Sequence, residues 1–474
     1  MGGEIPAALQ LALRRGFQVH PEAIRALESA DPESVARAIR EAIRTREREG
    51  GRTISGGDVA AALGIAPADE PFENAYETLD DPTGRTASAE GVGGFGALFA
   101  SRFEKMRALV SGRPEARSIR HAADLAGARP EEGAHACGLV TERRVGAGRS
   151  DRLVIEDPTG TLELAVYDDA AREAAASLVN DQFVMVRLGA ARDGGLVARE
   201  ISVPDVSGHS PRTSGVEVHA VLLSDLHVGS RYFDEAAFGR LLEWLNGADA
   251  VASRVGYVLV CGDVVDGVGI YPNQDRELVL QTVEEQLARL DELVAQIPER
   301  IRVVISPGNH DPGRRALPQP AIPRELAPGL WGRPNVEMVG NPATVLLNGV
   351  RVLMFHGQSV DDVVKVAPGL SYDRPAGVMK FLLRARHLCP IYGGGTPLAP
   401  ESEDMLVVGE APDIFHAGHV HVVGAEQYRG VLMVNSGTWQ GQTPFQAGLG
   451  IEPTVGRAIV VNLKTLAPVQ RDFA

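Results

Sequence analysis

Cysteine is scarce in this sequence: Cys137, Cys261 and Cys389 are the only three among 474 residues. They lie far apart and form no Cys-x-x-Cys pair, so neither a zinc knuckle nor a redox-active dithiol is predicted. We expect reduced and mostly buried thiols, which is typical of a cytoplasmic protein.

Long apolar runs are absent as well. No stretch of 18 apolar residues occurs, so no membrane-spanning helix is predicted. The segment Met1–Ile5 shows no basic stretch followed by an apolar one, and we therefore expect no secretory signal. Both absences favour a cytoplasmic location without a membrane partner.

Positive charge is in short supply, since the formal net charge is −15. A protein that holds DNA by itself usually carries a basic surface. An acidic chain can still act on nucleic acid if metal ions neutralise phosphates locally or if a partner supplies a basic groove. A salt-adapted host would also favour an acidic surface.

The length predicts about three domains. Residues 1–50 are predicted to form a small helical module, with Asp31 as N-cap and Pro32 in the first turn. Apolar residues then follow at four-residue steps: Val35, Ile39 and Ile43. Residues 51–94 are poor in apolar side chains and are predicted to be a flexible acidic linker.

Residues 95–208 are predicted to hold a docking helix and a small β-barrel. Phe95, Leu98, Phe99, Phe103, Met106 and Leu109 recur at helical spacing. Short alternating strands flank the turn Glu156–Gly160, a pattern that resembles an OB-fold. Asp80–Gly84 repeats that turn sequence, but no predicted strands flank it, so we assign it no hairpin.

The predicted barrel offers few groups for holding nucleic acid. Its only aromatic residues are Tyr167 and Phe183, whereas single-strand binding usually relies on stacking aromatics in a basic groove. The barrel is therefore either a DNA contact or a platform for another subunit, and both interpretations stay open.

Residues 209–474 alternate strands with helices. Five predicted strands each end at a polar motif, and Glu277–Leu293 is predicted as a crossover helix. The motifs are Asp225-Leu226-His227, Gly262-Asp263-Val264-Val265-Asp266, Gly308-Asn309-His310-Asp311, Phe355-His356-Gly357 and Gly418-His419-Val420-His421. Open α/β sheets place their sites at the carboxyl ends of strands, so these motifs predict one common site.

The residue types in these motifs predict two divalent metal ions. Carboxylate, amide oxygen and imidazole suit Mn²⁺, Mg²⁺, Fe²⁺ or Zn²⁺, and we expect Mn²⁺. Asp263 is the expected bridging ligand, because a carboxylate can offer one oxygen to each ion. The other predicted ligands are Asp225, His227 and His421 for one ion, and Asn309, His356 and His419 for the other.

Two further residues are predicted to be catalytic. His310 follows the ligand Asn309 and is the candidate for protonating the leaving oxygen. Asp266 is expected to accept a hydrogen bond from His310 and to fix its tautomer.

With these motifs, residues 215–440 resemble the calcineurin-like metallophosphoesterase superfamily. That resemblance implies a multidomain α+β protein whose last domain, 209–474, is a double-sheet αββα sandwich. The OB-fold barrel and the small N-terminal helical module would precede it. The superfamily includes protein phosphatases, nucleotidases and a repair nuclease.

A finer resemblance is to the small subunits of archaeal family D DNA polymerases. It rests on segments that carry no metal ligands: Ser371–Pro375, Arg386–Gly393 and Asn435–Gln440. The resemblance implies a 3′–5′ proofreading exonuclease that acts on DNA primer ends beside a large catalytic subunit and other replication factors. Eukaryotic relatives have lost the ligands, whereas this chain keeps them, so we predict activity.

Three basic residues extend the predicted site. Arg374, Lys380 and Arg384 lie on or next to a predicted amphipathic helix and are candidates for DNA backbone contact, with a solvated or subunit-facing helix as the alternative. Two other functions also remain open. The chain would be a free-standing phosphoesterase for small phosphoesters, or a non-catalytic scaffold for the polymerase subunit.

Overall fold

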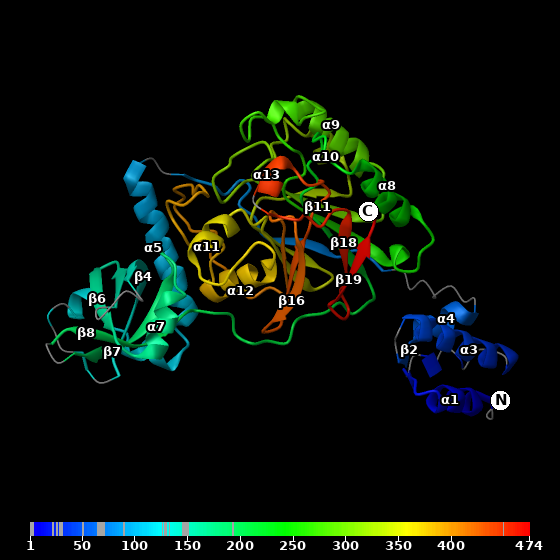
Figure 1. Ribbon diagram of the computed structural model, residues 1–474, viewed down its shortest axis with the longest axis horizontal. Helices are drawn as coiled ribbons and strands as arrows, with labels where there is room; N and C mark the ends of the chain where they lie inside the picture. The colour runs from blue at the N-terminus through cyan, green and yellow to red at the C-terminus, as the bar shows by residue number, and fades with distance from the viewer. Residues whose placement is uncertain are drawn as a thin grey trace. The chain divides into compact units, whose positions relative to one another are not determined.

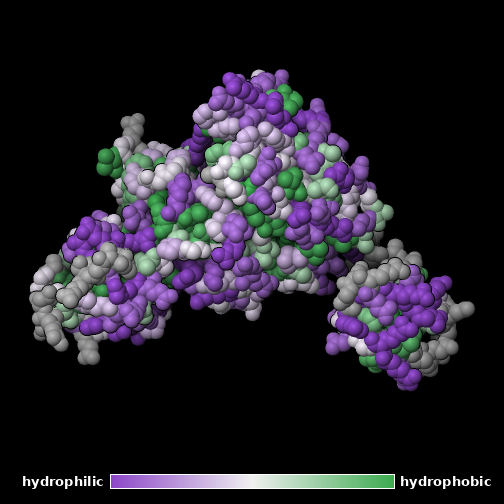
Figure 2. Space-filling model, viewed as in Figure 1, coloured by the Kyte–Doolittle hydropathy of each residue, from purple (hydrophilic) through white to green (hydrophobic). Residues whose placement is uncertain are grey.

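The computed structural model describes residues 4–20, 23–24, 27, 32–49, 52–63, 72–88, 91–125, 127, 130–131, 133–144, 151–191, 194–448 and 450–474. The chain divides into two compact units, Met1–Glu73 and Asn74–Ala474. Over the described residues, no helix combines the length and the apolar character needed to cross a membrane. Figure 2 shows a face dominated by hydrophilic residues, as the net charge leads one to expect, with hydrophobic residues gathered in small patches.

The first unit packs helices around a small apolar core. Its elements are α1 (Glu4–Arg14), β1 (Gln18–Val19), α3 (Pro32–Glu49), β2 (Thr53–Ile54) and α4 (Gly56–Leu63), and the two strands pair in parallel. The predicted spacing in α3 is confirmed, because Val35, Ile39 and Ile43 are all buried. Helix α3 begins at Pro32 as predicted, while the predicted N-cap Asp31 lies outside the described residues.

The structure differs from the flexible linker predicted over 51–94. Part of that range is α4, and β3 (Tyr76–Asp80) is an edge strand paired antiparallel with β13 (Ala343–Leu347). The side chains of β3 are exposed or half-buried, so backbone hydrogen bonds hold the strand and the sequence shows little apolar signal. Asp81 Oδ1 accepts the Thr83 N–H at 2.8 Å, so the repeated turn sequence forms a real turn.

A closed five-stranded barrel follows, with strand order β4-β5-β6-β8-β7. Its elements are η1 (Pro114–Ser118), α6 (Ala122–Leu125), β4 (His135–Arg144), β5 (Arg152–Asp157), β6 (Gly160–Val166), α7 (Asp169–Ala176), β7 (Phe183–Ala190) and β8 (Leu196–Ser202). The predicted hairpin turn is confirmed, since Asp157 Oδ1 accepts from the Thr159 and Gly160 N–H groups at 2.8 and 3.1 Å. Phe183 is buried and unavailable for stacking on a base, whereas Tyr167 is exposed.

Helix α5 (Gly91–Val110) is the predicted docking helix, and it contacts two regions. Phe103 packs against Phe183 of the barrel, with ring centroids 5.8 Å apart. On the other side, Arg102 Nε lies 2.8 Å from the carboxylate of Asp404, and both side chains are buried. The helix therefore joins the barrel to the C-terminal region through one apolar and one charged contact.

The C-terminal region contains two six-stranded sheets. The first has the order β12-β11-β10-β9-β18-β19 and the second β16-β17-β15-β14-β13-β3. The first sheet comprises β9 (His219–Leu223), β10 (Val255–Cys261), β11 (Arg302–Ser306), β12 (Val336–Met338), β18 (Arg457–Asn462) and β19 (Ala467–Asp472). The second adds β14 (Val350–Met354), β15 (Ile414–Ala417), β16 (Val423–Tyr428) and β17 (Val431–Ser436) to β3 and β13.

Helices cover the sheets, as Figure 1 shows. They are α8 (Glu235–Asn246), η2 (Ala252–Arg254), η3 (Gln274–Arg276), α9 (Val283–Val294), α10 (Pro328–Gly332), α11 (Val360–Val366), α12 (Pro375–Ala385) and α13 (Pro444–Gly448). One apolar cluster joins α8 and α9 to the first sheet, and another joins α11 and α12 to the second. The predicted crossover helix is shorter than expected, because a capping box of Thr282 and Glu285 starts it at Val283.

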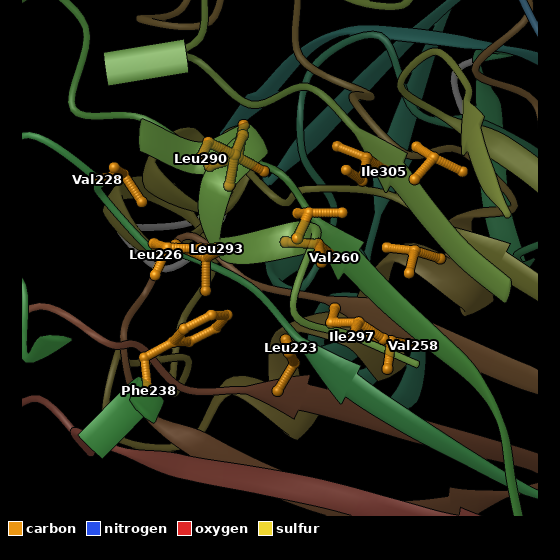
Figure 3. Packing of buried hydrophobic residues seen from close by; sticks show 14 of the residues in the cluster. Leu223, Leu226, Val228, Phe238, Val258, Val260, Leu290, Leu293, Ile297 and Ile305 are labelled. Carbon is orange, nitrogen blue, oxygen red and sulfur yellow. The ribbon is translucent and has the colours of Figure 1, made fainter. Parts of the chain in front are cut away.

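The three central parallel strands of the first sheet, β9, β10 and β11, are buried on both faces over nearly all their residues. Every residue of β9 is buried, and Leu223 and Val260 face α8 and α9 in the cluster of Figure 3. Near the site edge, the Cys261 thiol of β10 lies 3.6 Å from the His416 carbonyl of β15 in the other sheet. Parallel strands buried on both faces read as continuous apolar runs, which is why the sequence located these strands well.

Candidate metal centre

The predicted ligands follow the carboxyl ends of β9, β10, β11, β14 and β15. Five of the seven have a positive φ: Asp225 52°, His227 52°, Asp263 49°, His419 70° and His421 60°. Such left-handed backbone costs about 1–3 kcal/mol for a residue with a side chain, and it persists only where the surrounding structure holds it. Strain is thus concentrated where the sequence places the chemistry.

At three positions in these motifs only glycine fits, because a Cβ atom would clash with a neighbouring side chain. A Cβ on Gly308 would lie 2.2 Å from Asp263 Oδ1, and one on Gly418 would lie 2.4 Å from Asp225 Oδ2. A Cβ on Gly262 would lie 2.3 Å from Nδ1 of His356. No real side chain fits at these distances, so the ligand loops can approach one another only because these positions lack one.

One group of possible ligand atoms comprises Asp225, His227 and His421, which lie within 4.8 Å of one another. His421 Nε2 is 3.3 Å from Asp225 Oδ1 and 3.2 Å from His227 Nε2. All three side chains are buried. These are the residues predicted for the first metal.

A second group comprises Asp263, His356 and His419, again within 4.8 Å. His356 Nε2 is 3.2 Å from Asp263 Oδ2 and 3.1 Å from Asn309 Oδ1. All four residues predicted for the second metal therefore meet around one point. Asp263 lies between the two groups, since its Oδ2 is also 3.8 Å from His227 Nε2.

With His356 in its neutral form, the ligand atoms of this group fit a cation better than they fit each other. His356 Nδ1 faces the Cys261 carbonyl oxygen at 2.9 Å, so the ring proton of the neutral side chain belongs on Nδ1. The Nε2 lone pair then points at the oxygens of Asp263 and Asn309, which are also acceptors. Lone pairs that converge without a proton between them are the arrangement that a divalent cation satisfies.

The charges agree with this fit. Burial lowers the pKa of His356, but the Asp263 carboxylate outweighs burial and raises that pKa to about 10. Burial likewise raises the pKa of Asp263, yet His356 and His310 hold it well below its usual value. Asp263 therefore stays ionised and attracts positive charge, whether a proton or a metal ion supplies it.

Asp266 differs from its predicted role. Its carboxylate accepts from His227 Nδ1 at 3.0 Å and from Gln440 Nε2 at 3.0 Å, and it does not contact His310. The backbone carbonyl of Asp266, not its side chain, faces His310 Nδ1 at 2.8 Å. The turn after β10 directs the side chain towards the His227 ring, so Asp266 orients a predicted ligand.

His310 lies beside the predicted metal ligands and was not itself predicted to be one. Its ring packs edge-on against His227 with centroids 4.7 Å apart, and its backbone N–H donates to Asp263 Oδ1 at 2.8 Å. With Nδ1 on the Asp266 carbonyl, Nε2 is the nitrogen left for a substrate. Burial lowers the pKa of His310.

The sequence analysis missed two residues that contact predicted ligands. Asp361 Oδ2 lies 3.3 Å from His419 Nε2. Burial raises the pKa of Asp361, but the nearby His419 outweighs burial and lowers this pKa to about 2. Gln446 Nε2 lies 2.6 Å from His421 Nδ1. Neither residue belongs to a strand-end motif, so only the folded arrangement reveals them.

Asp311 is a third omission, although its position directly after His310 was a usable signal. It is buried and accepts N–H groups from Gly308 at 2.8 Å and from Val265 at 3.0 Å. Burial and then Asp263 raise the pKa of Asp311 to about 7. The side chain ties the loop after β10 to the loop after β11.

The two groups open into a pocket of about 440 Å³. Its polar lining includes His227, Asp263, Asn309, His310 and His419. A second part of the lining is apolar or aromatic: Ile270, Tyr271, Tyr372, Phe445 and Ile451. Lys365 supplies a cation at this pocket.

The predicted basic residues lie elsewhere. Helix α12 is amphipathic as expected, with Arg374 at its N-cap and with Lys380 and Arg384 exposed one turn apart. None of the three lines the pocket of the metal centre. Lys380 Nζ stands over the Tyr428 ring at 4.9 Å. The structure thus brings together all seven predicted ligands, His310 and Asp266, but not these cations.

Comparisons with known proteins point to one family. Residues 220–422 match the family model for the B subunit of DNA polymerases alpha and epsilon. The DNA polymerase II small subunit of Methanothermobacter thermautotrophicus is 38% identical over 84% of this chain and 83% of its own length. That of Archaeoglobus fulgidus is 39% identical over 81% and 78%. That of Halobacterium salinarum is 34% identical over 95% and 96%.

Among solved structures, the similarity is remote. The zinc-complexed Vps29 of Entamoeba histolytica is 13% identical, with a TM-score of 0.27 over 54% of this chain and all of that one. The archaeal sequences carry the assignment, because they are 34% to 39% identical over 81% to 95% of this chain. The chain belongs to the family of archaeal DNA polymerase II small subunits.

Proposed function

We propose that this protein is a two-metal 3′–5′ exonuclease that removes nucleotides from DNA primer ends as the small subunit of a replicative DNA polymerase. The observation that carries the proposal is the central place of Asp263 between two groups of histidine and acidic side chains. Family membership favours DNA over other phosphoesters. Nucleoside 5′-monophosphates are the expected product.

The proposed ligands would hold two divalent cations through oxygen and nitrogen atoms. Two divalent cations held here would supply a nucleophile at neutral pH and offset the charge on the phosphoryl oxygens. Asp225, Asp263 and Asn309 offer oxygen ligands, and the four predicted histidine ligands offer nitrogen, a set that suits Mn²⁺ among others.

His310 is the proposed acid for the leaving 3′-oxygen. Its Nδ1 is engaged by the Asp266 carbonyl, so its imidazolium form can donate only from Nε2, at the pocket. A bound phosphodiester is an anion, and an anion beside the ring favours the protonated form. Lys365 is the proposed contact for a neighbouring phosphate.

The proposed fold assignment follows from the same arrangement. The two sheets with their flanking helices are proposed to be a calcineurin-like sandwich over 209–474. The five-stranded barrel is proposed to be an OB-fold within 95–208, after a helical module at 1–50 and a connecting segment at 51–94. The family's large polymerase subunit is the proposed partner, and with a net charge of −15 that partner is expected to provide most of the DNA-binding surface.

The test is an exonuclease assay with Mn²⁺ and a primer that carries a 3′ mismatch. We expect the wild-type protein to release mononucleotides and His310→Ala to release almost none. His121→Ala is a matched control, because His121 lies beside the barrel, 3.6 Å from Asp157, and should leave the rate unchanged. The assay is run with and without the large subunit.

Two other results would replace the proposal. Hydrolysis of a small phosphodiester without release from DNA would favour a free-standing phosphoesterase. Inactivity on both substrates with the large subunit present would favour a non-catalytic scaffold.

A further inference from the structure

The pocket beside the metal centre has an apolar rim, defined here as Ile270, Phe445 and Ile451. Phe445 is 70% exposed, although an aromatic ring of this size is usually at least half covered. Ile270 and Ile451 are half-buried at the same pocket. Apolar surface next to a cluster of charged ligands has no role in holding metal ions, so it calls for another explanation.

The position of Phe445 is fixed relative to the metal ligands. Its neighbour Gln446 is buried and lies 2.6 Å from Nδ1 of His421. The Gln446 Oε1 atom accepts the backbone N–H of Thr443 at 3.0 Å, and the Thr443 hydroxyl accepts the backbone N–H of Gln446 at 3.3 Å. The short helix α13 is therefore attached to a predicted ligand on one side while it presents Phe445 to solvent on the other.

The polar side chains around the rim are occupied by other parts of the protein. The Tyr271 hydroxyl donates to Glu277 at 3.1 Å, and Gln440 Nε2 donates to Ser230 and Asp266, each at 3.0 Å. A ligand at the rim would therefore meet flat and apolar groups more than free donors. Such a surface recognises the face of a ring and is indifferent to the pattern of hydrogen-bonding groups on its edge.

We propose that the apolar rim binds the base of the 3′-terminal nucleotide by stacking it on Phe445. This inference rests on the proposed exonuclease function and assigns the residue that holds the terminal base. Stacking accepts all four bases, as an enzyme that trims any wrong nucleotide requires. The pocket of about 440 Å³ is of the size that holds one small ligand, so the terminal nucleotide enters only after it leaves its template.

The test compares two oligonucleotides that differ only in their last residue, which is a normal nucleotide in one and an abasic residue in the other. We expect Phe445→Ala to slow release of the normal nucleotide by about 5- to 100-fold, the range expected for loss of one stacked base. Release of the abasic residue should be nearly unchanged. Phe445→Trp should retain most of the activity, and Val469→Ala is the control for loss of an exposed apolar side chain elsewhere.

A binding measurement gives a second readout that does not depend on turnover. In the His310→Ala background with Mn²⁺, fluorescence anisotropy should show weaker binding of the normal oligonucleotide after Phe445→Ala, and equal binding of the abasic one. Equal losses on both oligonucleotides, or no loss on either, would overturn the stacking proposal. If the wild-type protein releases nothing from either oligonucleotide, the exonuclease function itself fails, which is a separate outcome.

Discussion

Two buried clusters of charged side chains in this protein look alike by composition and differ in how their atoms are paired. The candidate metal centre groups aspartates and histidines whose possible ligand atoms converge, as His356 Nε2 does on Asp263 and Asn309. The second cluster, called the Arg102 cluster here, consists of Arg102, His387 and Asp404. In it, each close contact to the carboxylate of Asp404 comes from a donor: Arg102 Nε at 2.8 Å and His387 Nε2 at 2.9 Å.

Other atoms of the Arg102 cluster are engaged as well, except Arg102 Nη2, which is buried without a hydrogen-bond partner among the described residues. His387 Nδ1 accepts the Cys389 N–H at 3.0 Å, and Asp404 Oδ1 accepts the Leu406 N–H at 2.9 Å. The cluster therefore needs no ion and ties α5 to the C-terminal region. Burial of charge alone does not mark a functional site; convergence of several possible metal-ligand atoms at a pocket does.

The largest effect is expected from Asp263→Asn in the metal centre. An amide cannot offer charged oxygens to two cations, so the exonuclease rate should fall by more than about 100-fold, beyond the usual loss for residues that only orient ligands. Rate assays at several Mn²⁺ concentrations check this. A variant that regains the wild-type rate at high Mn²⁺ would show that Asp263 is not the shared ligand.

Asp404→Asn should lower the stability of the protein and leave the exonuclease rate unchanged, so its effect is the reverse of a change in the candidate metal centre. It leaves the buried Arg102 without its counter-charge, which typically costs about 3–5 kcal/mol. Urea unfolding should show this loss, while the exonuclease rate of the folded protein stays near that of the wild type. A lost rate with unchanged unfolding would contradict the division of roles.

Asp266→Asn should have an intermediate effect. The amide still occupies the space but no longer accepts the His227 Nδ1–H as a carboxylate does, so Mn²⁺ affinity should fall by about 10- to 100-fold. Isothermal titration of Mn²⁺ measures it directly. Asp275→Asn is the control, since Asp275 lies in η3 next to Gln274 but has no contact with His227 among the described residues.

The smallest effect is expected from lowering the pH, which should reduce stability through the Arg102 cluster. Burial, and then the charge of Arg102, lower the pKa of His387. Burial raises the pKa of Asp404, but His387 and Arg102 outweigh it and lower that pKa well below its usual value. Both folded pKa values lie below the unfolded ones of about 6.5 and 3.9, so stability should fall first below pH 6.5 and again below pH 4. Melting temperatures across this range should fall less steeply for His387→Gln.

The sequence predicts the residues that stand in strand-end motifs and misses those that lie outside them. The grouping of all seven candidate ligands was predictable because each stands in a motif at the end of a mostly apolar strand, and such strands are easy to place. The Asp266 contact was predicted wrongly because it depends on the backbone turn after β10, which the residue types do not specify. Asp361 and Gln446 lie outside the motifs and meet their histidines only in the folded chain.

The same limit applies to the fold. The strand β3 escaped prediction because an edge strand needs backbone pairing more than apolar side chains. The Arg102 cluster escaped because Arg102 lies 302 residues before Asp404 in the sequence, and no local pattern relates the two.

The glycines of the metal centre have a consequence for how such a site can be built or inherited. Changing Gly418 or Gly308 to alanine keeps every donor in the chain, yet the added methyl group would lie only 2.4 or 2.2 Å from a carboxylate oxygen. Copying the seven ligands onto another scaffold would fail for the same reason unless the empty positions were copied too. A working copy of this centre therefore needs the glycines as well as the ligands, because the glycines leave the space that the ligands occupy.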